Sequence, residues 1–256
     1  MVPLSKAKRK LFRSLQQKKF RQREGRFLLP GKKLLGEALR AGWPVEWVVA
    51  TEGTVVAEVP PDRILGTDIS TLRELSGQVQ PEGIVAVVRI PPEKSYSQIS
   101  QAAEMPPLTG PAFILDGVSD PGNLGTLIRT ADGMGFEAII AGPGTADIFN
   151  PKVLRSSMGS IFRLRVIYLA DLPGWLNAVA ERVCIADMGG IPLPEPRFLN
   201  RPFIVLGNEA NGVSPAIKAL PGTLPVSIPG RGGAESLNVA VSGAVLAWEM
   251  MRARGE

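Results

Sequence analysis

The order of hydrophobic and polar residues predicts alternating strands and helices along most of the chain. Short runs of consecutive apolar residues are typical of buried strands, and apolar residues repeated every three or four positions are typical of amphipathic helices. The first 91 residues contain both patterns. We expect a helix that begins after Ser5, an extended segment followed by a helix at 27–42, a strand at 44–50, a helix at 67–77 and a strand at 82–90.

From residue 112 onward the pattern restarts and becomes more regular. The expected strands are apolar at nearly every position, so both of their faces are covered in the folded chain. Strands of this kind, separated by helices, predict a parallel sheet with helices on both faces. The expected strands lie at 112–118, 137–144, 164–170, 182–190, 203–210 and 224–230, and the expected helices at 123–135, 150–160 and 235–255.

A polar segment with prolines at both ends separates the two patterns. This composition is typical of a linker between domains. The sequence therefore predicts an α/β protein in two parts. A small α/β domain occupies residues 1–91, a linker occupies 92–110, and a larger α/β domain occupies 111–256.

Absent residue types narrow the possible chemistry. The chain has no histidine, which excludes His-based triads, His–metal sites and proton transfer by imidazole. The one cysteine, Cys184, lies in an apolar run, so we expect it to be buried, with no internal disulfide and no multi-cysteine metal site. No apolar stretch is long enough for a membrane helix, and the N-terminus lacks a signal-peptide pattern. We expect a cytoplasmic protein with no bound metal and no membrane contact.

Positive charge is concentrated near the N-terminus. Residues 1–26 contain ten Lys or Arg and one acid, a net charge of +9, whereas the whole chain carries +5, which leaves −4 for the remainder. This pattern favours a phosphate-rich partner, because Lys and Arg gain affinity by displacing condensed counterions. On charge alone, a solvated terminal helix is an equally good interpretation.

Three of the expected strand ends are rich in Gly, Asn and Glu. Ligands collect at the carboxyl ends of the strands in an open parallel sheet. At the first end, Gly122, Asn123 and Gly125 predict a tight turn whose backbone N–H groups could hold an anion, with Arg129 further along the helix. An ordinary strand-to-helix turn is the alternative for this segment.

The second end carries Gly207, Asn208 and Glu209, and the third carries Ser236 and Asn238 after a glycine-rich loop. Because Gly207 has no side chain, the backbone at this position could approach a ligand closely. The alternatives are that the glutamate is only a charge near a helix N-terminus and that the serine is only an N-cap. None of the three ends is a dinucleotide-binding fingerprint, since the nearest match, GNLGTL, lacks the third glycine.

Taken in order, the three ends resemble the three motifs of the SpoU/TrmH RNA ribose methyltransferases of the SPOUT superfamily. The first motif, N-x-G-x-x-x-R-T-A, stands at 123–131, the second, LGNEANGVS, at 206–214, and the third, SIPGRGGAESLNVAVSGAVL, at 227–246. NPKVLRSSMGSIFRLRV at 150–166 resembles the connecting segment of the family. The resemblance covers about residues 111–252, and the upstream region is similar to the substrate-binding module of the family.

Two positions depart from the family pattern. Leu29-Pro30-Gly31 stands where V-E-G is common, and Gly230, followed by Arg231, stands where a methionine is common after the proline. We therefore expect the N-terminal contact to differ from that of the family, together with the packing of the third-motif loop.

The resemblance implies a fold, a reaction and a homodimer. Family members have a parallel sheet whose C-terminal part forms a deep trefoil knot, an exception to unknotted topology, and their site is completed across the dimer interface. The implied reaction moves a methyl group from S-adenosylmethionine to a ribose 2′-hydroxyl of RNA. A separate N-terminal module favours ribosomal over transfer RNA. The expected RNA contacts are Lys6, Lys8, Arg9, Lys10, Arg13, Lys18, Lys19, Arg21 and Arg23.

The resemblance also implies roles for individual residues of the second domain. The catalytic roles fall on Asn123, Arg129, Glu209 and Asn238, with Ser236 as a weaker candidate. The cofactor contacts, made largely by backbone groups, fall on Gly207, Ile228 and Leu237, with Leu206, Asn208 and Pro229 nearby.

Two interpretations of Arg129 stay open. A guanidinium has a pKa above about 12 and is a poor base in water. Either an RNA phosphate helps Arg129 shed or relay a proton, or Arg129 clamps the phosphate and stabilises the developing alkoxide while the proton leaves by another route. Lysine lacks the planar fork, so both interpretations predict that it cannot replace this residue.

Two rival functions are compatible with the same fold. One is a noncatalytic RNA-binding or ribosome-assembly factor, and the other is an enzyme of the same superfamily that methylates a base. The presence of Asn123, Arg129, Glu209 and Asn238 argues against the first. Transfer RNA is the alternative substrate for a ribose methyltransferase.

Overall fold

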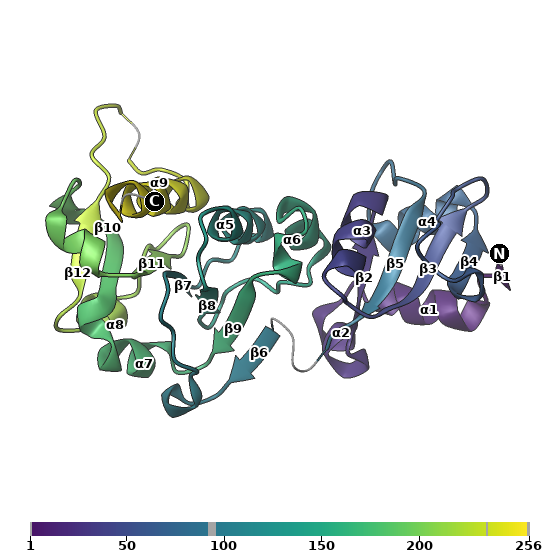
Figure 1. Ribbon diagram of the computed structural model, residues 1–256, viewed down its shortest axis with the longest axis horizontal. Helices are drawn as coiled ribbons and strands as arrows, with labels where there is room; N and C mark the ends of the chain where they lie inside the picture. Colours follow the sequence, from purple (N-terminus) through teal and green to yellow (C-terminus); the bar gives the residue numbers. More distant parts are fainter. Residues whose placement is uncertain (1, 92–95, 234, 255–256) are drawn as a thin grey trace. The chain divides into compact units, whose positions relative to one another are not determined.

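The computed structural model describes residues 2–91, 96–233 and 235–254, which form two compact units (Figure 1). The first unit comprises Met1–Lys94 and Asp147–Phe162, and the second comprises Ser95–Ala146 and Arg163–Glu256. No helix in the described ranges is both long enough and apolar enough to cross a membrane.

The first unit is built on a five-stranded mixed sheet with the order β1-β4-β3-β5-β2. Strand β4 is parallel to β1 and β3, whereas β5 is antiparallel to β3 and β2. β1 and β4 were not expected, since both are short and have no continuous apolar run. The strands are β1 (Val2–Pro3), β2 (Arg26–Pro30), β3 (Val45–Thr51), β4 (Ile64–Thr67) and β5 (Ile84–Arg89).

The expected N-terminal helix is present but divided in two. It begins after Ser5, whose side chain accepts a hydrogen bond from the backbone N–H of Lys8 at 3.3 Å, and a turn at residues 15–17 interrupts it. This confirms the predicted start and corrects the predicted length. The helices of the unit are α1 (Lys6–Ser14), α2 (Lys18–Glu24), α3 (Lys32–Arg40), α4 (Ile69–Ser76) and α6 (Pro151–Ser156), with short 3-10 turns η1 (Pro61–Arg63) and η3 (Ser160–Phe162).

Successive side chains of β2 point to opposite faces of this sheet, and each face has its own core. Leu28 packs with Phe12 of α1 and Leu72 of α4. On the other face, Phe27 stacks on Phe149, with ring centroids 4.7 Å apart. The segment 147–162 therefore belongs to the first unit because its aromatic residues cover the second face of the sheet, although we predicted it in the larger domain.

Arg21 fixes this segment to the N-terminal helices. The side chain is only 4% exposed, donates to the backbone carbonyls of Leu15 and Gln16 at 2.9 and 2.7 Å, and forms an ion pair with Asp147. Its guanidinium is therefore fully engaged within the unit. The burial and pairing of Arg21 do not support the prediction that it contacts RNA.

The second unit contains a seven-stranded sheet with the order β12-β10-β11-β7-β8-β9-β6, in which every pairing is parallel. The expected strands are all present. β6 was not expected, because it is a short edge strand within the predicted linker. The strands are β6 (Tyr96–Ile99), β7 (Ala112–Asp116), β8 (Ala138–Ala141), β9 (Arg165–Leu169), β10 (Val183–Pro192), β11 (Phe203–Gly207) and β12 (Leu224–Ser227).

Helices cover both faces of this sheet, as predicted. Trp175 of α7 and Ile217 of α8 share one core with Ile114 and Phe203 of the strands. On the other face α9 packs closely on α5 and β11, since a Cβ at Gly243 would lie only 2.5 Å from a methyl carbon of Leu127. The helices are α5 (Pro121–Gly133), α7 (Leu172–Ala178), α8 (Pro215–Lys218) and α9 (Val239–Arg254), with 3-10 turns η2 (Ala102–Glu104), η4 (Ala180–Arg182) and η5 (Pro196–Asn200).

Replacement of Arg21 by alanine should destabilise the first unit. Asp147 would lose its partner, and two carbonyl groups would lose their donor, so we expect the free energy of unfolding to fall by about 2–4 kcal/mol. Urea denaturation measures this loss. The control is Arg23→Ala, because Arg23 is exposed and contacts only the nearby Glu24 and Phe20 through its guanidinium among the described residues; it should change stability by less than about 0.5 kcal/mol. Equal losses in the two variants would contradict a structural role for Arg21.

Candidate active site

Two of the predicted loops meet at the carboxyl edge of the parallel sheet. Strands β7 and β11 are neighbours, and Asp116 at the end of β7 is in register with Gly207 at the end of β11. Because both strands run in the same direction, the chain leaves them on the same side of the sheet. The side chain of Asn208 then donates to the carbonyl of Gly117 at 2.9 Å, which joins the two loops directly.

Glu209 is the acceptor for a group of hydrogen bonds at the start of α5. Its carboxylate accepts from the backbone N–H of Ser119 and of Asp120 at 3.1 and 3.0 Å, and from the hydroxyl of Ser119 at 3.0 Å. It also accepts from the side-chain amide of Asn123 at 2.9 Å. The carboxylate therefore fixes the orientation of Asn123 as well as the loop before the helix.

Asn238 joins the same network from the third motif. Its amide nitrogen donates to the side-chain oxygen of Asn123 at 3.0 Å, while its own oxygen accepts from the backbone N–H of Ala240 at 2.9 Å. Asn238 thus caps α9, a role that the alternative interpretation of the sequence gave to Ser236. The helix begins four residues later than predicted, at Val239. Three residues from distant motifs, Asn123, Glu209 and Asn238, are brought together as the sequence predicted.

Arg129 and Ser236 do not join this network. Arg129 lies six positions after Asn123 on α5, which places their side chains about 120° apart around the helix. Arg129 is exposed, and within the described ranges its side chain has no hydrogen bond or ion pair. Ser236 is exposed as well, and within the same ranges it has no hydrogen bond.

The turn before α5 does not provide a free anion site. Asp120 is the N-cap, and its carboxylate accepts from the backbone N–H of Gly122 and Asn123 at 2.7 and 2.9 Å. These are two of the groups that we expected to hold an anion, and an internal acceptor already occupies them. The signal that could have predicted this cap is an Asp followed by Pro121 at the first helical position.

The packing of the backbone around position 207 requires a glycine there. A Cβ at this position would lie 2.1–2.4 Å from backbone atoms of Gly212 and Val213. The loop 208–212 closes on itself through backbone hydrogen bonds of 3.0 and 2.9 Å between Asn208 and Gly212. The close approach that the glycine allows is therefore to the returning chain, and this approach shapes the loop that carries Glu209.

The predicted cofactor residues lie at the same edge of the sheet. Leu206 is buried in β11, while Ile228 and Pro229 follow β12 directly. One strand, β10, separates β11 from β12, so the two strands are about 10 Å apart. Leu237 precedes α9 and is 49% exposed. Backbone groups and apolar side chains are therefore available for a ligand along this edge.

Comparison with known proteins identifies the family. Residues 111–248 match the SpoU rRNA Methylase family, and residues 6–86 match the MRM3-like substrate binding domain. The chain belongs to the SpoU rRNA methylase family. It is 34% identical to the 23S rRNA (guanosine(2553)-2′-O)-methyltransferase RlmP of Bacillus subtilis, over 93% of this chain and 94% of that protein.

Solved SpoU structures have the same fold over the full length. A TrmH-family protein from Porphyromonas gingivalis is 34% identical, with a TM-score of 0.80, and the match covers 98% of this chain and 99% of that one. The SpoU methyltransferase AviRb from Streptomyces viridochromogenes, in complex with AdoMet, is 26% identical with a TM-score of 0.79, and the match again covers 98% and 99% of the two chains.

Several of the predicted RNA contacts of this SpoU protein are paired within its own first unit. Arg9 and Arg13 form ion pairs with Glu74, and the ammonium group of Lys8 lies 3.2 Å from the centroid of the Trp47 ring. Four other predicted contacts are exposed lysines, which leaves their charges accessible to a phosphate-rich partner. They are Lys6, Lys10, Lys18 and Lys19.

Cys184 is fully buried, as predicted. Burial raises the pKa of its thiol to about 12. The side chain is therefore neutral and unreactive at neutral pH.

The pKa of Glu209 lies below its ordinary value. Burial acts to raise it, but the hydrogen bonds from Asn123, Asp120 and Ser119 together lower it further than burial raises it. The network therefore prefers the ionised carboxylate. Glu209→Gln should weaken the network, because an amide has one acceptor oxygen and would turn N–H groups towards the backbone donors.

We expect Glu209→Gln to lower the free energy of unfolding at pH 7 by about 1–2 kcal/mol, as the site is open to solvent. A depressed pKa contributes stability above the unfolded pKa and loses it as pH falls through the folded pKa. The difference between wild type and variant should therefore shrink below about pH 4. Urea denaturation at pH 7 and pH 3.5 measures both values. A difference independent of pH would show that the charge is not what the network stabilises.

Proposed function

We propose that this protein transfers a methyl group from S-adenosylmethionine to a ribose 2′-hydroxyl of ribosomal RNA. The observation that carries the proposal is the Asn123–Glu209–Asn238 network at the carboxyl edge of the sheet, in a chain of the SpoU rRNA methylase family. Two relatives support the substrate and the donor: RlmP is a 23S rRNA 2′-O-methyltransferase, and AviRb has a structure in complex with AdoMet.

The edge of the sheet has the chemistry that this cofactor needs. Adenosine and the methionine chain are bound by apolar contact and by hydrogen bonds to backbone groups. Ile228 and Leu237 supply partly or largely exposed apolar side chains, and the ends of β11 and β12 supply backbone N–H and C=O groups. S-adenosylmethionine supplies an activated methyl group when it is bound. Gly207, Ile228 and Leu237 would hold it, with Leu206, Asn208 and Pro229 beside them.

Arg129 would contact the RNA directly, although it does not belong to the Asn123–Glu209–Asn238 network of its own chain. Its guanidinium is exposed and free of internal partners among the described residues, so it is available to clamp a phosphate and stabilise negative charge on the ribose oxygen. Asn123, oriented by Glu209 and Asn238, would position the ribose. Ser236 has the weakest support, because it contacts none of these residues.

In a homodimer, Arg129 of one copy would lie near the Asn123–Glu209–Asn238 network of the other copy. An apolar stripe, defined here as Leu237, Val241, Val245 and Trp248, follows one face of α9 and its N-terminal approach. These side chains are 38–59% exposed, although each is large and apolar. Exposed stripes of this kind mark interaction surfaces. α9 packs against α5, the helix that carries Arg129, so an interface that extends from this stripe onto α5 would bring Arg129 near the second copy.

We also propose that the second unit contains a trefoil knot. Strand β11 lies between β10 and β7, although both β7 and β10 precede it in sequence. The chain then passes from β12 through the third-motif loop to α9, which packs on β11. This order of strands supports a chain that is threaded through its own loop at the cofactor edge.

Methyl transfer from labelled S-adenosylmethionine to ribosomal RNA tests the activity. Wild type should give a product whose neighbouring phosphodiester resists alkali, since a 2′-O-methyl group blocks that cleavage. We expect Arg129→Lys to reduce kcat/KM by about 100-fold or more, because lysine cannot form the bidentate contact. Arg197→Lys is the control, since Arg197 is exposed and pairs only with Glu195 among the described residues.

Three outcomes would count against this proposal. No transfer to ribosomal RNA at any protein concentration would favour a noncatalytic RNA-binding factor. A labelled product that alkali still cleaves would indicate base methylation. Transfer to tRNA alone would replace the proposed substrate.

Substitution of Trp248 by glutamate should produce a monomer. A charge within the apolar stripe would be buried without a partner in the dimer. Light scattering should give wild type twice the mass of the 27.4 kDa chain and Trp248→Glu the mass of one chain. The matched control is Val79→Glu, since Val79 is 87% exposed and lies outside the stripe. A monomeric wild type, or a dimeric Trp248→Glu, would contradict the proposed interface.

A further inference from the structure

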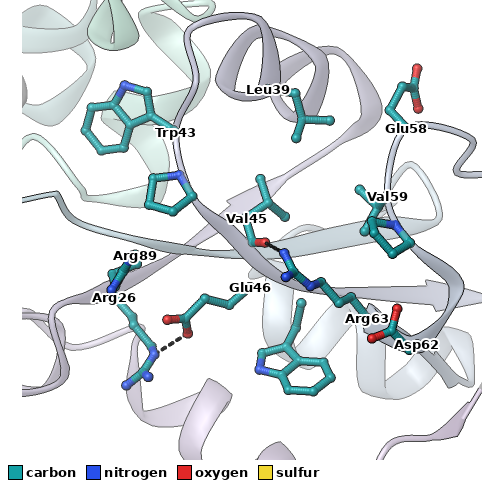
Figure 2. Close-up of a pocket in the computed structure, with 13 residues that line it drawn as sticks. Arg26, Leu39, Trp43, Val45, Glu46, Glu58, Val59, Asp62, Arg63 and Arg89 are labelled. Atoms are coloured by element: carbon teal, nitrogen blue, oxygen red, sulfur yellow. Dashed lines mark hydrogen bonds and ion pairs between the residues drawn. The ribbon is translucent and has the colours of Figure 1, made fainter.

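The first unit contains a cavity of about 770 Å³ that the proposed methyl transfer does not use (Figure 2). Its wall combines the start of β2, the turn from α3 into β3, the loop 58–63 and the end of β5. Apart from the residue at the end of β5, all of it falls within the match to the substrate-binding domain. The cavity is large enough for a ligand of nucleotide size.

A bulge in β3 shapes one side of this cavity. Val45 pairs with Val88, and the next pairing joins Trp47 to Val87, so Glu46 is an extra residue on this strand. Bulges redirect side chains and are frequent beside functional sites. Both Glu46 and Trp47 line the cavity as a result.

The cavity is lined by three cationic and three anionic side chains. The cations are Arg26, Arg63 and Arg89, and the carboxylates are Glu46, Glu58 and Asp62. Figure 2 shows Arg26 paired with Glu46, and Arg63 donating to the carbonyl of Val45 at 3.3 Å. In contrast, the exposed side chain of Arg89 forms no hydrogen bond or ion pair within the described ranges. A lining of this composition is neutral overall, which disfavours a site for phosphate alone.

Trp47 adds an aromatic surface to this polar lining. The indole is partly buried against the core of the unit and also lines the cavity. Lys8 lies over its ring, 3.2 Å from the centroid, and so covers part of it. Trp47 is partly exposed, so a flat heterocycle that displaces the Lys8 ammonium group can stack on the indole.

We infer that this cavity binds one unpaired base of the RNA substrate. A base is flat, neutral and edged with both N–H donors and acceptors, and it matches an indole surrounded by carboxylates and guanidinium groups. Proteins that recognise RNA commonly stack unpaired bases on aromatic side chains and read their edges by hydrogen bonds. The inference rests on the proposed function and adds a determinant of substrate choice that is separate from the methyl-transfer site.

Five RNA hairpins test the site. One is fully paired, and the others carry a single bulged A, C, G or U at the same position. We expect wild type to prefer at least one bulged hairpin in fluorescence anisotropy. Trp47→Leu keeps apolar volume in the core but removes the stacking surface, and Arg89→Ala removes an exposed donor. Trp47→Leu should weaken binding of the preferred hairpin by roughly 5- to 150-fold and leave the fully paired hairpin within about twofold of wild type.

The controls separate this site from general RNA affinity and from catalysis. Arg73→Ala removes the same charge from an exposed position of the same unit outside the cavity, and should retain the preference for the bulge. The slope of log affinity against log salt should not change in Trp47→Leu, because no phosphate contact is lost. Binding of S-adenosylmethionine should also match wild type in both cavity variants.

Two outcomes would overturn the inference. One is a wild-type protein that binds all five hairpins equally, and the other is a loss in the cavity variants that is the same for bulged and paired RNA. The proposed function fails independently, through the absence of methyl transfer by a wild type that still prefers the bulge.

Discussion

The arrangement of the methyltransferase unit depends on the hydrogen bonds that the carboxylate of Glu209 accepts. It accepts from the backbone and side chains of residues about 90 positions earlier in the chain, at the start of α5. Groups at a helix start have no acceptors within the helix, so an external acceptor there has a large effect on the position of the helix. Glu209 orients Asn123 by accepting a hydrogen bond from its side-chain amide, and Asn123 in turn accepts a hydrogen bond from Asn238. Asn238 then caps α9, so one carboxylate links three motifs and two helices.

Close packing of the chain on itself makes this arrangement possible. Gly207 lets the backbone at Gly212 and Val213 approach to distances that no side chain would permit. The loop that results presents Glu209 to the neighbouring strand end and holds Asn208 against Gly117. A glycine that we first interpreted as a means of ligand approach is therefore required for the geometry of the acceptor. The two explanations are compatible, because the same tight loop leaves backbone groups at the edge where the cofactor would lie.

The sequence predicted the features that depend on local pattern. The apolar runs located the strands of the second unit, and three motifs in order located Asn123, Glu209 and Asn238. It failed where structure depends on partners distant in sequence. β6 has no apolar run and exists because β9 offers a free edge. Arg21 looks like any other cation of the basic segment until Asp147 and two carbonyls are placed around it. Ser and Asn are about equally favoured as N-caps, so preference alone could not choose between Ser236 and Asn238, and the helix starts after Asn238.

The position of Arg129 on α5 is consistent with the proposed homodimer. The network needs Asn123 near the start of α5, while the guanidinium projects from a different side of the same helix, about 120° away. The two side chains therefore leave the helix in different directions. The exposed stripe on α9, next to α5, offers a way to satisfy both, because a second copy placed there would supply Arg129 to a network that is not its own. The proposed homodimer would therefore account for both the position of one exposed arginine and the exposure of one apolar helix face.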